Sequence, residues 1–339
     1  EFPLFYKFSG LGQFSRFPKA VLEDEPYPVR GLMILGGSPV LSFPDSKSWR
    51  EAYKKLDCLI VLDRYFTEDA RYADVVFPAC SLFEAPKAVP GPEGPHIVEP
   101  LIEPVGESKN DVLIMGAIAK KLGFGDKLPQ TEEELRSWLL SGTAPYAGDF
   151  GTSADQKKEK HYKKYETGEL RADGKPGFPT PSGKLEICST ILEENGFVPY
   201  PEYKDVRSIP ELAGKEYPFT MTSGARSNNR MGVFGANLDK IAEIEPYPFV
   251  DINEEDAKEI GIKDGDMVKV ITPFADGTFK AKIRGIARHA IHIPHGGGSA
   301  YMAEPWKNGN VNDLCSLDYA DPMTGFVLIK SVPCRVEKV

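Results

Sequence analysis

Residues 31–39, Gly-Leu-Met-Ile-Leu-Gly-Gly-Ser-Pro, decide the fold of the first part of this chain. The apolar run before the two glycines predicts a buried strand that ends in a tight turn. Helical spacing of apolar residues follows over 46–56, and a second apolar run over 59–62 ends at Asp63. Two buried strands joined by a helix form a β-α-β unit, so we expect an α/β fold with a parallel sheet.

Further elements are predicted on both sides of this unit. Prolines punctuate residues 1–30, which we expect to be irregular. Residues 84–106 are rich in proline and glycine and are expected to form an ordered loop or a covering segment. The remaining predictions for this part are a helical turn over 67–72, a strand over 74–78, and helices over 111–122 and 132–140.

The second part of the chain has a different pattern. Residues 141–215 show little periodicity and are expected to form a connecting excursion on the surface, with a turn at 178–186. Short strands are predicted at 219–222, 249–252, 267–271, 278–283, 290–294 and 334–336, with a helix at 254–260 and a turn at 276–277. Many short strands with few helices predict a closed β-barrel. We therefore divide the chain into a nucleotide-binding domain at 1–150, a connection at 151–214 and a barrel domain at 215–339.

Composition argues against nucleic acid as a partner, against a cysteine-ligated metal site and against a membrane span. The 339 residues carry a net charge of −9, which argues against nucleic acid as the main partner because phosphate backbones bind basic surfaces. The five cysteines contain no Cys-x-x-Cys pair, so we expect no iron–sulfur cluster or zinc site built from this chain alone. We find no apolar run of about 20 residues for a membrane span and no signal peptide. The chain begins at Glu1 without Met, so we interpret it as a processed product or an excised piece, and its compartment stays open.

The glycine turn after the first strand is the first candidate for ligand binding. Gly36 and Gly37 let backbone N–H groups approach a ligand closely, and the start of the helix after Ser38 and Pro39 favours negative charge. A phosphate or diphosphate fits this arrangement, and a tight strand-to-helix turn without a ligand explains it about equally well. The Gly-x-Gly-x-x-Gly pattern of nicotinamide-binding proteins is absent.

Two aspartates lie where nucleotide contacts are common. Asp63 ends the second predicted strand, where a carboxylate can take a ribose hydroxyl or the N1–H and N2–H groups of guanine. Asp111 opens a predicted helix. Taken alone, each is explained better by a local structural role, Asp63 as the cap of the next turn and Asp111 as an N-cap or first-turn residue.

Polar residues gather in later segments. Residues 222–230, Thr-Ser-Gly-Ala-Arg-Ser-Asn-Asn-Arg, offer many donors for a polar heterocycle and phosphates, and a solvated loop is the alternative. His292 and His295 precede three glycines, and without a carboxylate or cysteine close in sequence they make a weak metal site. A loop that passes close to a ligand explains these glycines better. Asn312 and Lys330 complete the polar set.

Seven segments in this order resemble the dimethyl-sulfoxide-reductase family of molybdenum enzymes. They span nearly the whole chain and read GLMILGGSPVLSFPD, LIVLDRYFTEDARYADVVFPA, FPTPSGKLEI, TMTSGARSNNRM, FVDINEEDAKEIGIKDGDMVKV, IPHGGG, and NVNDL with DPMTGFVLIK. Seven segments in the right order and spacing are far more specific than any one of them. The resemblance implies a Rossmann-like parallel-sheet domain that holds a guanine nucleotide, followed by a double-psi β-barrel domain that lies over the pterins.

The cofactor implied by the resemblance is bis(molybdopterin guanine dinucleotide) with molybdenum or tungsten. Gly36, Gly37, Ser38 and Pro39 match the family's nucleotide turn, where many members have Asn at the position of Ser38. Asp63 matches a strand-end residue and Asp111 a helix-start residue that contact the nucleotide, which reverses the local interpretation of both. The positions that match pterin and phosphate contacts are Thr222, Ser223, Gly224, Arg226, Asn228, Arg230, His295, Asn312 and Lys330.

Two family features have no counterpart in this sequence, the N-terminal cysteine-rich iron–sulfur segment and the residue that ligates the metal. The resemblance therefore implies a C-terminal portion that is not catalytic alone. Its expected partner is the N-terminal half or a separate chain carrying it, with an iron–sulfur electron-transfer subunit as a further candidate. The alternatives are a portion of a non-redox hydratase or hydroxyl-transferring relative, a stand-alone pterin-nucleotide module, and a GTP-binding protein, for which a Walker-type lysine loop is missing.

Overall fold

The computed structural model describes residues 2–91, 94–141, 163–224, 238–302, 304 and 306–339. Contacts group the chain into two compact units. The first unit comprises residues 1–81, 104–114 and 206–339, and the second comprises residues 82–103 and 115–205. The first unit contains both the predicted sheet and the predicted barrel, so it holds the candidate site residues.

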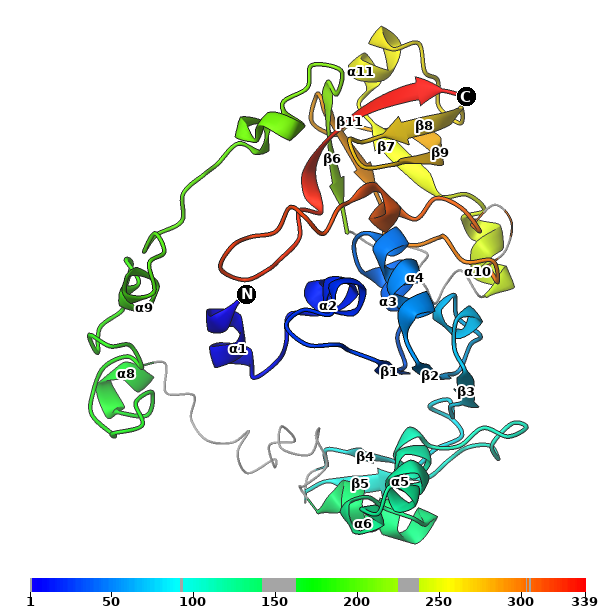
Figure 1. The fold of residues 1–339 in the computed structure, drawn as a ribbon, viewed down its shortest axis with the longest axis vertical. Helices are drawn as coiled ribbons and strands as arrows, with labels where there is room; N and C mark the ends of the chain where they lie inside the picture. The colour runs from blue at the N-terminus through cyan, green and yellow to red at the C-terminus, as the bar shows by residue number, and fades with distance from the viewer. Residues whose placement is uncertain (1, 92–93, 142–162, 225–237, 303, 305) are drawn as a thin grey trace. The chain divides into compact units, whose positions relative to one another are not determined.

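A parallel sheet forms the first part of this unit, as predicted (Figure 1). Its strands are β1 (Gly31–Leu35), β2 (Cys58–Asp63) and β3 (Val75–Pro78), in the order β1-β2-β3. The register pairs Gly31 with Cys58 and Ile60 with Val75, so the carboxyl ends of all three strands meet at one edge. The connections carry α3 (Pro39–Ser42), α4 (Ser46–Lys55) and a 3-10 turn at Asp69–Arg71.

Helix α4 packs an aromatic face against this sheet. Its first turn is capped by Asp45, whose Oδ1 accepts from the backbone N–H of Ser48 at 3.1 Å. Trp49 and Tyr53 then lie one turn apart and are each 3% exposed. The buried core that they share contains Ile34, Val40, Leu41, Leu59, Val61 and Ala70, together with Met302 and Trp306 from a loop of the barrel. The sheet and that loop therefore have one core.

The prediction of an irregular N-terminal segment is wrong. Residues 1–30 contain α1 (Pro3–Ser9), a 3-10 turn (Phe14–Arg16) and α2 (Phe17–Glu23). The prolines lie in the first turns of these helices, where a missing N–H is tolerated and the fixed φ favours helix. Pro3 and Pro18 therefore lie at the starts of helices, whereas the sequence pattern predicted irregular structure there.

The second part of the unit is a closed six-stranded barrel, as predicted (Figure 1). Its strands are β6 (Phe219–Ser223), β7 (Phe249–Ile252), β8 (Met267–Ile271), β9 (Asp276–Ile283), β10 (Ala290–Ile293) and β11 (Lys330–Lys338). They close in the order β10-β6-β11-β8-β9-β7, with β10–β6 and β7–β9 parallel and the other pairs antiparallel. Alternate residues fill the interior, among them Met221, Ile252, Val270, Phe279, Ile291 and Cys334.

The turn between β8 and β9 lies earlier than predicted. Asp276 and Gly277 are strand residues, paired with Ile271 and Val270. The turn is made by 272–275, because the Thr272 hydroxyl accepts from the backbone N–H groups two and three residues later, each at 3.2 Å. A threonine side chain thus outcompetes the Asp-Gly pair as the turn former.

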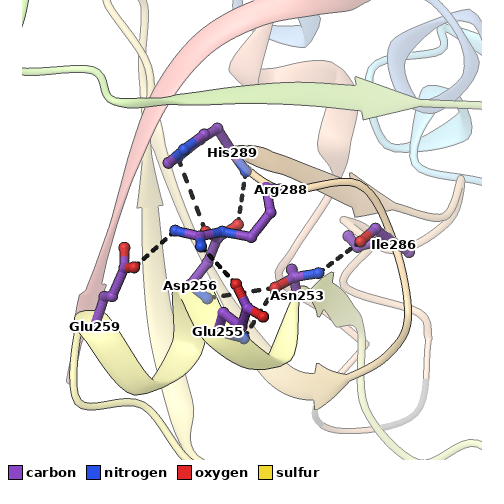
Figure 2. Close-up of polar contacts among 7 residues, drawn as sticks. All are labelled: Asn253, Glu255, Asp256, Glu259, Ile286, Arg288 and His289. Carbon is purple, nitrogen blue, oxygen red and sulfur yellow. Dashed lines mark hydrogen bonds and ion pairs between the residues drawn. The ribbon is translucent and has the colours of Figure 1, made fainter.

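Helix α11 (Glu254–Glu259) is fastened to the barrel by Arg288 (Figure 2). The guanidinium bonds Asp256 at 2.6 Å, Glu255 at 2.6 Å and Glu259 at 2.7 Å. Asp256 is 1% exposed, and its other oxygen accepts from the backbone N–H of His289 at 2.7 Å. The strand connection before β10 is therefore tied to the helix through one buried carboxylate.

The second unit is smaller and contains the antiparallel pair β4 (Lys87–Val89) and β5 (His96–Val98) with α6 (Glu132–Leu140) packed on it. Helix α5 (Asp111–Lys121) begins in the first unit and continues into the second. Residues 142–162 of the predicted excursion lie outside the described part. Its described part has the predicted turn, closed by the Phe178 N–H to the Gly183 carbonyl at 2.9 Å. The remaining helices are α8 (Lys164–Thr167), α9 (Thr190–Glu194) and, in the first unit, α10 (Asp239–Ile244).

Candidate functional site

The glycine turn sits at the carboxyl edge of the sheet. Gly36 has φ +58°, a conformation that glycine adopts without strain, and its N–H donates to the Leu62 carbonyl at 2.8 Å. That bond fixes the turn after β1 against the end of β2. The turn and Asp63 are therefore brought together, as the β-α-β argument predicts.

Ser38 faces inward rather than toward a ligand. The residue is 7% exposed, and its hydroxyl donates to the buried carboxylate of Asp69. The backbone N–H of Val40, at the start of α3, also donates to Asp69, at 3.1 Å. Two donors expected to face an anion are thus used within the protein. Among the described residues, none accepts a hydrogen bond from the backbone N–H groups of Gly37 and Ser38, so these two donors are not used within the turn.

Asp63 keeps part of its local structural role. Its Oδ1 accepts from the backbone N–H of Tyr65 at 3.0 Å, which is the turn-capping contact considered from the sequence. Burial raises the pKa of Asp63, and the hydrogen bonds from the backbone of Tyr65 and Arg64 act in the opposite direction. One carboxylate oxygen of Asp63 is therefore engaged by the turn.

Asp111 lies in the first turn of α5, which is one of the two local roles considered from the sequence, and Asn110 caps the helix. The Asn110 Oδ1 accepts from the backbone N–H of Val112 at 2.9 Å at the start of α5. Among the described residues, none donates a hydrogen bond to the Asp111 carboxylate. Burial, and then the charge of Asp63, raise the pKa of Asp111, while the nearby Arg64 lowers it. The structure thus places a half-buried carboxylate, with no hydrogen bond from a described residue, within the electrostatic influence of Asp63.

His295 and Asn312 belong to the barrel loops that contact the sheet. Asn312 is 4% exposed, and its amide donates to the carbonyl of Leu41 in α3 at 2.7 Å. The same amide nitrogen lies 3.4 Å from the His295 Nδ1. The Asn312 carbonyl accepts from the N–H of Asp45 at 2.9 Å. These two predicted residues therefore lie against the helix that follows the glycine turn.

The other predicted barrel residues lie on β6 and β11. Thr222 pairs with Lys330 on β11, and because Met221 points into the barrel, Thr222 lies on its outer face. The Ser223 hydroxyl donates to the Ile329 carbonyl at 2.8 Å, so its proton serves the barrel. Gly224 ends the described strand segment with φ +102°. Arg226, Asn228 and Arg230 lie outside the described residues.

Sequence reasoning missed a histidine–carboxylate pair next to Thr222. His292 pairs with Thr222 across β10 and β6, and its Nδ1 lies 3.1 Å from the Oδ2 of Asp251 on β7. The partner is 41 residues away in sequence, so only the barrel topology reveals it. In the described part of the chain no group of three or more His, Cys, Asp or Glu residues could hold a metal ion.

Two cavities of the first unit lie away from the predicted cofactor residues. One, of about 460 Å³, lies between α4, the β2–β3 connection and the barrel loop, and is lined by Arg50, Glu68, Arg71, Tyr72, Gly298, Ala300, Glu304, Lys307 and Asn308. The other, of about 420 Å³, is formed by the N-terminal helices. Neither is lined by a predicted cofactor residue, so the candidate site is the open carboxyl edge of the sheet.

Two stretches of the chain match known protein families. Residues 16–121, which include the glycine turn and both aspartates, match the family described as Molybdopterin oxidoreductase. Residues 220–333, which include the barrel strands and loops, match the family described as Molydopterin dinucleotide binding domain. All the predicted cofactor residues fall inside these two stretches.

Individual relatives agree with these matches. The chain is 30% identical over 285 residues to the F420-dependent formate dehydrogenase subunit alpha of Methanocaldococcus jannaschii, covering 81% of this chain and 39% of the relative. It is 25% identical over 302 residues to the acetylene hydratase of Syntrophotalea acetylenica, covering 85% and 40%. The solved structure of acetylene hydratase from Pelobacter acetylenicus shares the fold, with a TM-score of 0.76 at 24% identity, covering 95% of this chain and 46% of that one.

The matches place the chain among the molybdopterin oxidoreductase proteins and identify a molybdopterin dinucleotide-binding domain in it. In particular, the chain belongs to the dimethyl-sulfoxide-reductase family of molybdopterin enzymes. It spans about two fifths of the length of the curated relatives that it matches. No helix among the described residues is long and apolar enough to cross a membrane.

Proposed function

We propose that this chain binds molybdopterin guanine dinucleotide, as the cofactor-holding portion of a molybdenum or tungsten oxidoreductase. One observation carries the proposal, the pair of half-buried carboxylates Asp63 and Asp111 at the glycine turn. Burial raises the pKa of both, and no described residue donates a hydrogen bond to the Asp111 carboxylate. A ligand with two adjacent N–H donors would relieve this arrangement, and the N1–H and N2–H groups of guanine have that form.

The phosphate end of the nucleotide is proposed to lie over the turn itself. The backbone N–H groups of Gly37 and Ser38 are its donors, and Gly36 and Pro39 give the turn its shape. The two carboxylates and the turn share one edge of a parallel sheet, which is where ligands of α/β sheets bind. This geometry supports a Rossmann-like assignment for the domain that contains this sheet.

The pterin end is proposed to lie at the barrel domain, from about residue 215 onward. Thr222, Ser223, Gly224 and Lys330 would contact it from β6 and β11 together with Arg226, Asn228 and Arg230, and His295 and Asn312 would do so from the loops. The mixture of parallel and antiparallel pairs in a closed six-stranded barrel supports a double-psi topology. One dinucleotide would then join the sheet to the barrel.

The bound cofactor would supply the metal-centred chemistry, and the residues of this chain would bind and orient it. The relatives are more than twice as long as the stretch matched here, so we propose that the metal ligand and any iron–sulfur segment belong to that further length or to a separate chain. Similarity to an acetylene hydratase keeps a non-redox reaction as a second candidate.

Calorimetric titration of the chain with guanosine monophosphate (GMP), adenosine monophosphate and GTP tests the nucleotide assignment. We expect GMP to bind at least about tenfold more tightly than the adenine nucleotide, because adenine lacks the paired N–H donors. Asp111→Ala should remove most of that preference. Equal affinity for the two monophosphates, or binding of GTP that requires magnesium, would contradict the proposal. Molybdenum and GMP content of the reconstituted whole protein would extend the test to the cofactor.

A further inference from the structure

Asp69 lies behind the glycine turn and contacts it from a distant part of the chain. The residue is fully buried, at 0% exposure, in the 3-10 turn that connects β2 to β3. Its Oδ1 accepts from the Val40 N–H at 3.1 Å and from the Tyr53 hydroxyl at 2.7 Å, and its Oδ2 accepts from the Ser38 hydroxyl. One carboxylate therefore receives donors from the turn, from α3 and from α4.

These contacts hold the turn on both sides of Pro39. Ser38 precedes the proline and Val40 follows it, and Pro39 itself has no N–H to donate. Helix α3 has only four residues, so its dipole contributes little to anion binding. The shape of the turn, rather than a helix end, must then present the N–H groups of Gly37 and Ser38.

The direction of the Ser38 bond has a second effect. Because the Ser38 hydroxyl gives its proton to Asp69, only its lone pairs remain for other partners. A phosphate oxygen, which is an acceptor, gains nothing from that side chain. Burial raises the pKa of Asp69, and the hydrogen bonds from Ser38, Tyr53 and Val40 lower it. In its ionised form the carboxylate adds negative charge behind the turn, which weakens the binding of an anion.

We infer that Asp69 is a positioning residue that clamps the phosphate turn and directs the Ser38 proton away from the ligand. The inference rests on the proposed nucleotide function. It concerns only the phosphate end, since the donors to Asp69 come from Ser38, Val40 and Tyr53, on the side of the glycine turn.

The two simplest substitutions are expected to act in opposite directions. In Asp69→Asn the amide oxygen can still accept from Val40 and Tyr53. The amide N–H₂ donates to the Ser38 hydroxyl oxygen, so the hydroxyl proton becomes available to the phosphate. The substitution also removes the negative charge of the carboxylate. GMP affinity should rise several-fold. Asp69→Ala removes the clamp, and GMP affinity should fall by about tenfold or more. Guanosine, which lacks the phosphate, should bind all forms with equal affinity.

The matched control is Glu68→Ala, which removes the neighbouring buried carboxylate. Glu68 is 3% exposed and contacts Arg71 and the Ala300 N–H instead of the turn. Titrations are made well below the unfolding midpoint of each variant, measured by circular dichroism. The inference fails if Asp69→Ala binds GMP like the wild type, if Asn and Ala shift the affinity in the same direction, or if guanosine affinity falls equally. It fails too if Glu68→Ala reproduces the loss. A wild-type chain that binds neither GMP nor guanosine refutes the proposed function itself.

Discussion

Asp111 lies in the electric field of Asp63. Burial and then the Asp63 charge raise the pKa of Asp111 above its ordinary value of 3.8. Asp63 differs because hydrogen bonds from the backbone of Tyr65 and Arg64 oppose the effect of burial on its pKa. The Asp111 carboxylate has no such hydrogen bonds from described residues, so its negative charge is the less stabilised of the two. Such an arrangement destabilises the empty protein and favours a ligand that supplies donors.

Asp111→Asn is accordingly predicted to stabilise the chain while weakening nucleotide binding. Removing the charge relieves burial and repulsion, and because the site is half open to solvent we expect the thermal midpoint to rise by only about 1–3 °C at neutral pH. GMP affinity should fall by about tenfold, since the amide offers one acceptor and two donors to guanine N–H groups. Thermal unfolding and calorimetric titration measure the two effects. A variant with lowered stability and unchanged affinity would show that Asp111 is structural.

The pH dependence of the empty chain follows from the same pair. The folded-state pKa values of Asp63 and Asp111 are raised, so protonation favours the folded state. The stability that these groups contribute is fully present below their unfolded pKa, near 3.8, and is lost as pH rises through the higher folded values. The stability difference between Asp111→Asn and the wild type should therefore shrink as the solution is acidified to about pH 4. Urea unfolding at a series of pH values tests this, and a difference that grows on acidification would contradict it.

Asn110→Ala is predicted to show the reverse of Asp111→Asn. The Asn110 side chain caps α5 through the Val112 N–H, so its loss should reduce the free energy of unfolding by about 1 kcal/mol. Guanosine selectivity over adenosine should persist, because Asn110 supplies no carboxylate. Denaturant titration and nucleotide binding separate the two neighbouring residues. Loss of selectivity in this variant would mean that the cap and the base contact cannot be assigned to different residues.

Local patterns predicted the elements of the sheet and barrel well, because their apolar runs are buried as the periodicity requires. β1, α4, β2 and β3 all form within a few residues of the predicted bounds. The wrong predictions concern residue types that occur in more than one kind of local structure. Pro3 and Pro18 start helices, and the Thr272 hydroxyl moves a turn away from an Asp-Gly pair.

The candidate site was predictable only in part, since its residues are assembled by tertiary contacts. The sheet topology brings Gly36 to Asp63 and could be deduced from the β-α-β pattern. The contact from Asp69 to Ser38 joins residues 31 positions apart, and no local signal marks it. The cap at Asn110 was missed, because the sequence prediction began the helix at Asp111 and considered only that residue as the cap.

Cysteine reactivity is predicted to divide sharply. Burial raises the pKa of Cys315 and of Cys334 to about 12, whereas Cys58 and Cys188 are exposed. Because the thiolate is the reactive form, a maleimide should modify the exposed pair within minutes and leave the buried pair unmodified in the folded chain. Peptide mass spectrometry identifies the sites, with urea-unfolded protein as the control in which all five cysteines react. Rapid native labelling of Cys334 would show that the barrel core opens.

Arg288→Met should test how the barrel holds α11. The guanidinium of Arg288 is 37% exposed, but its partner Asp256 has no exposed side-chain surface, so the substitution leaves a buried carboxylate with the His289 N–H at 2.7 Å (Figure 2). We expect the free energy of unfolding to fall by roughly 2–3 kcal/mol, less than for a fully buried pair. Asp256→Asn in the same chain should restore part of that loss, because the uncompensated charge is then removed.

Arg335→Met is the matched control for this prediction. Arg335 is also 37% exposed, but its partner Glu337 is 52% exposed, so both charges remain solvated when the pair is broken. The loss should stay below about 1 kcal/mol, because an exposed ion pair contributes little and the contact of the guanidinium with the Tyr217 ring, 5.7 Å from its centroid, is also lost. Urea unfolding measures the free energy of unfolding of the wild type, of Arg288→Met, of Arg335→Met and of the Arg288→Met/Asp256→Asn double variant. Equal losses for the two arginines would mean that partner burial does not set the strength of these pairs, and that the Arg288 cluster is surface charge rather than the fastening of α11.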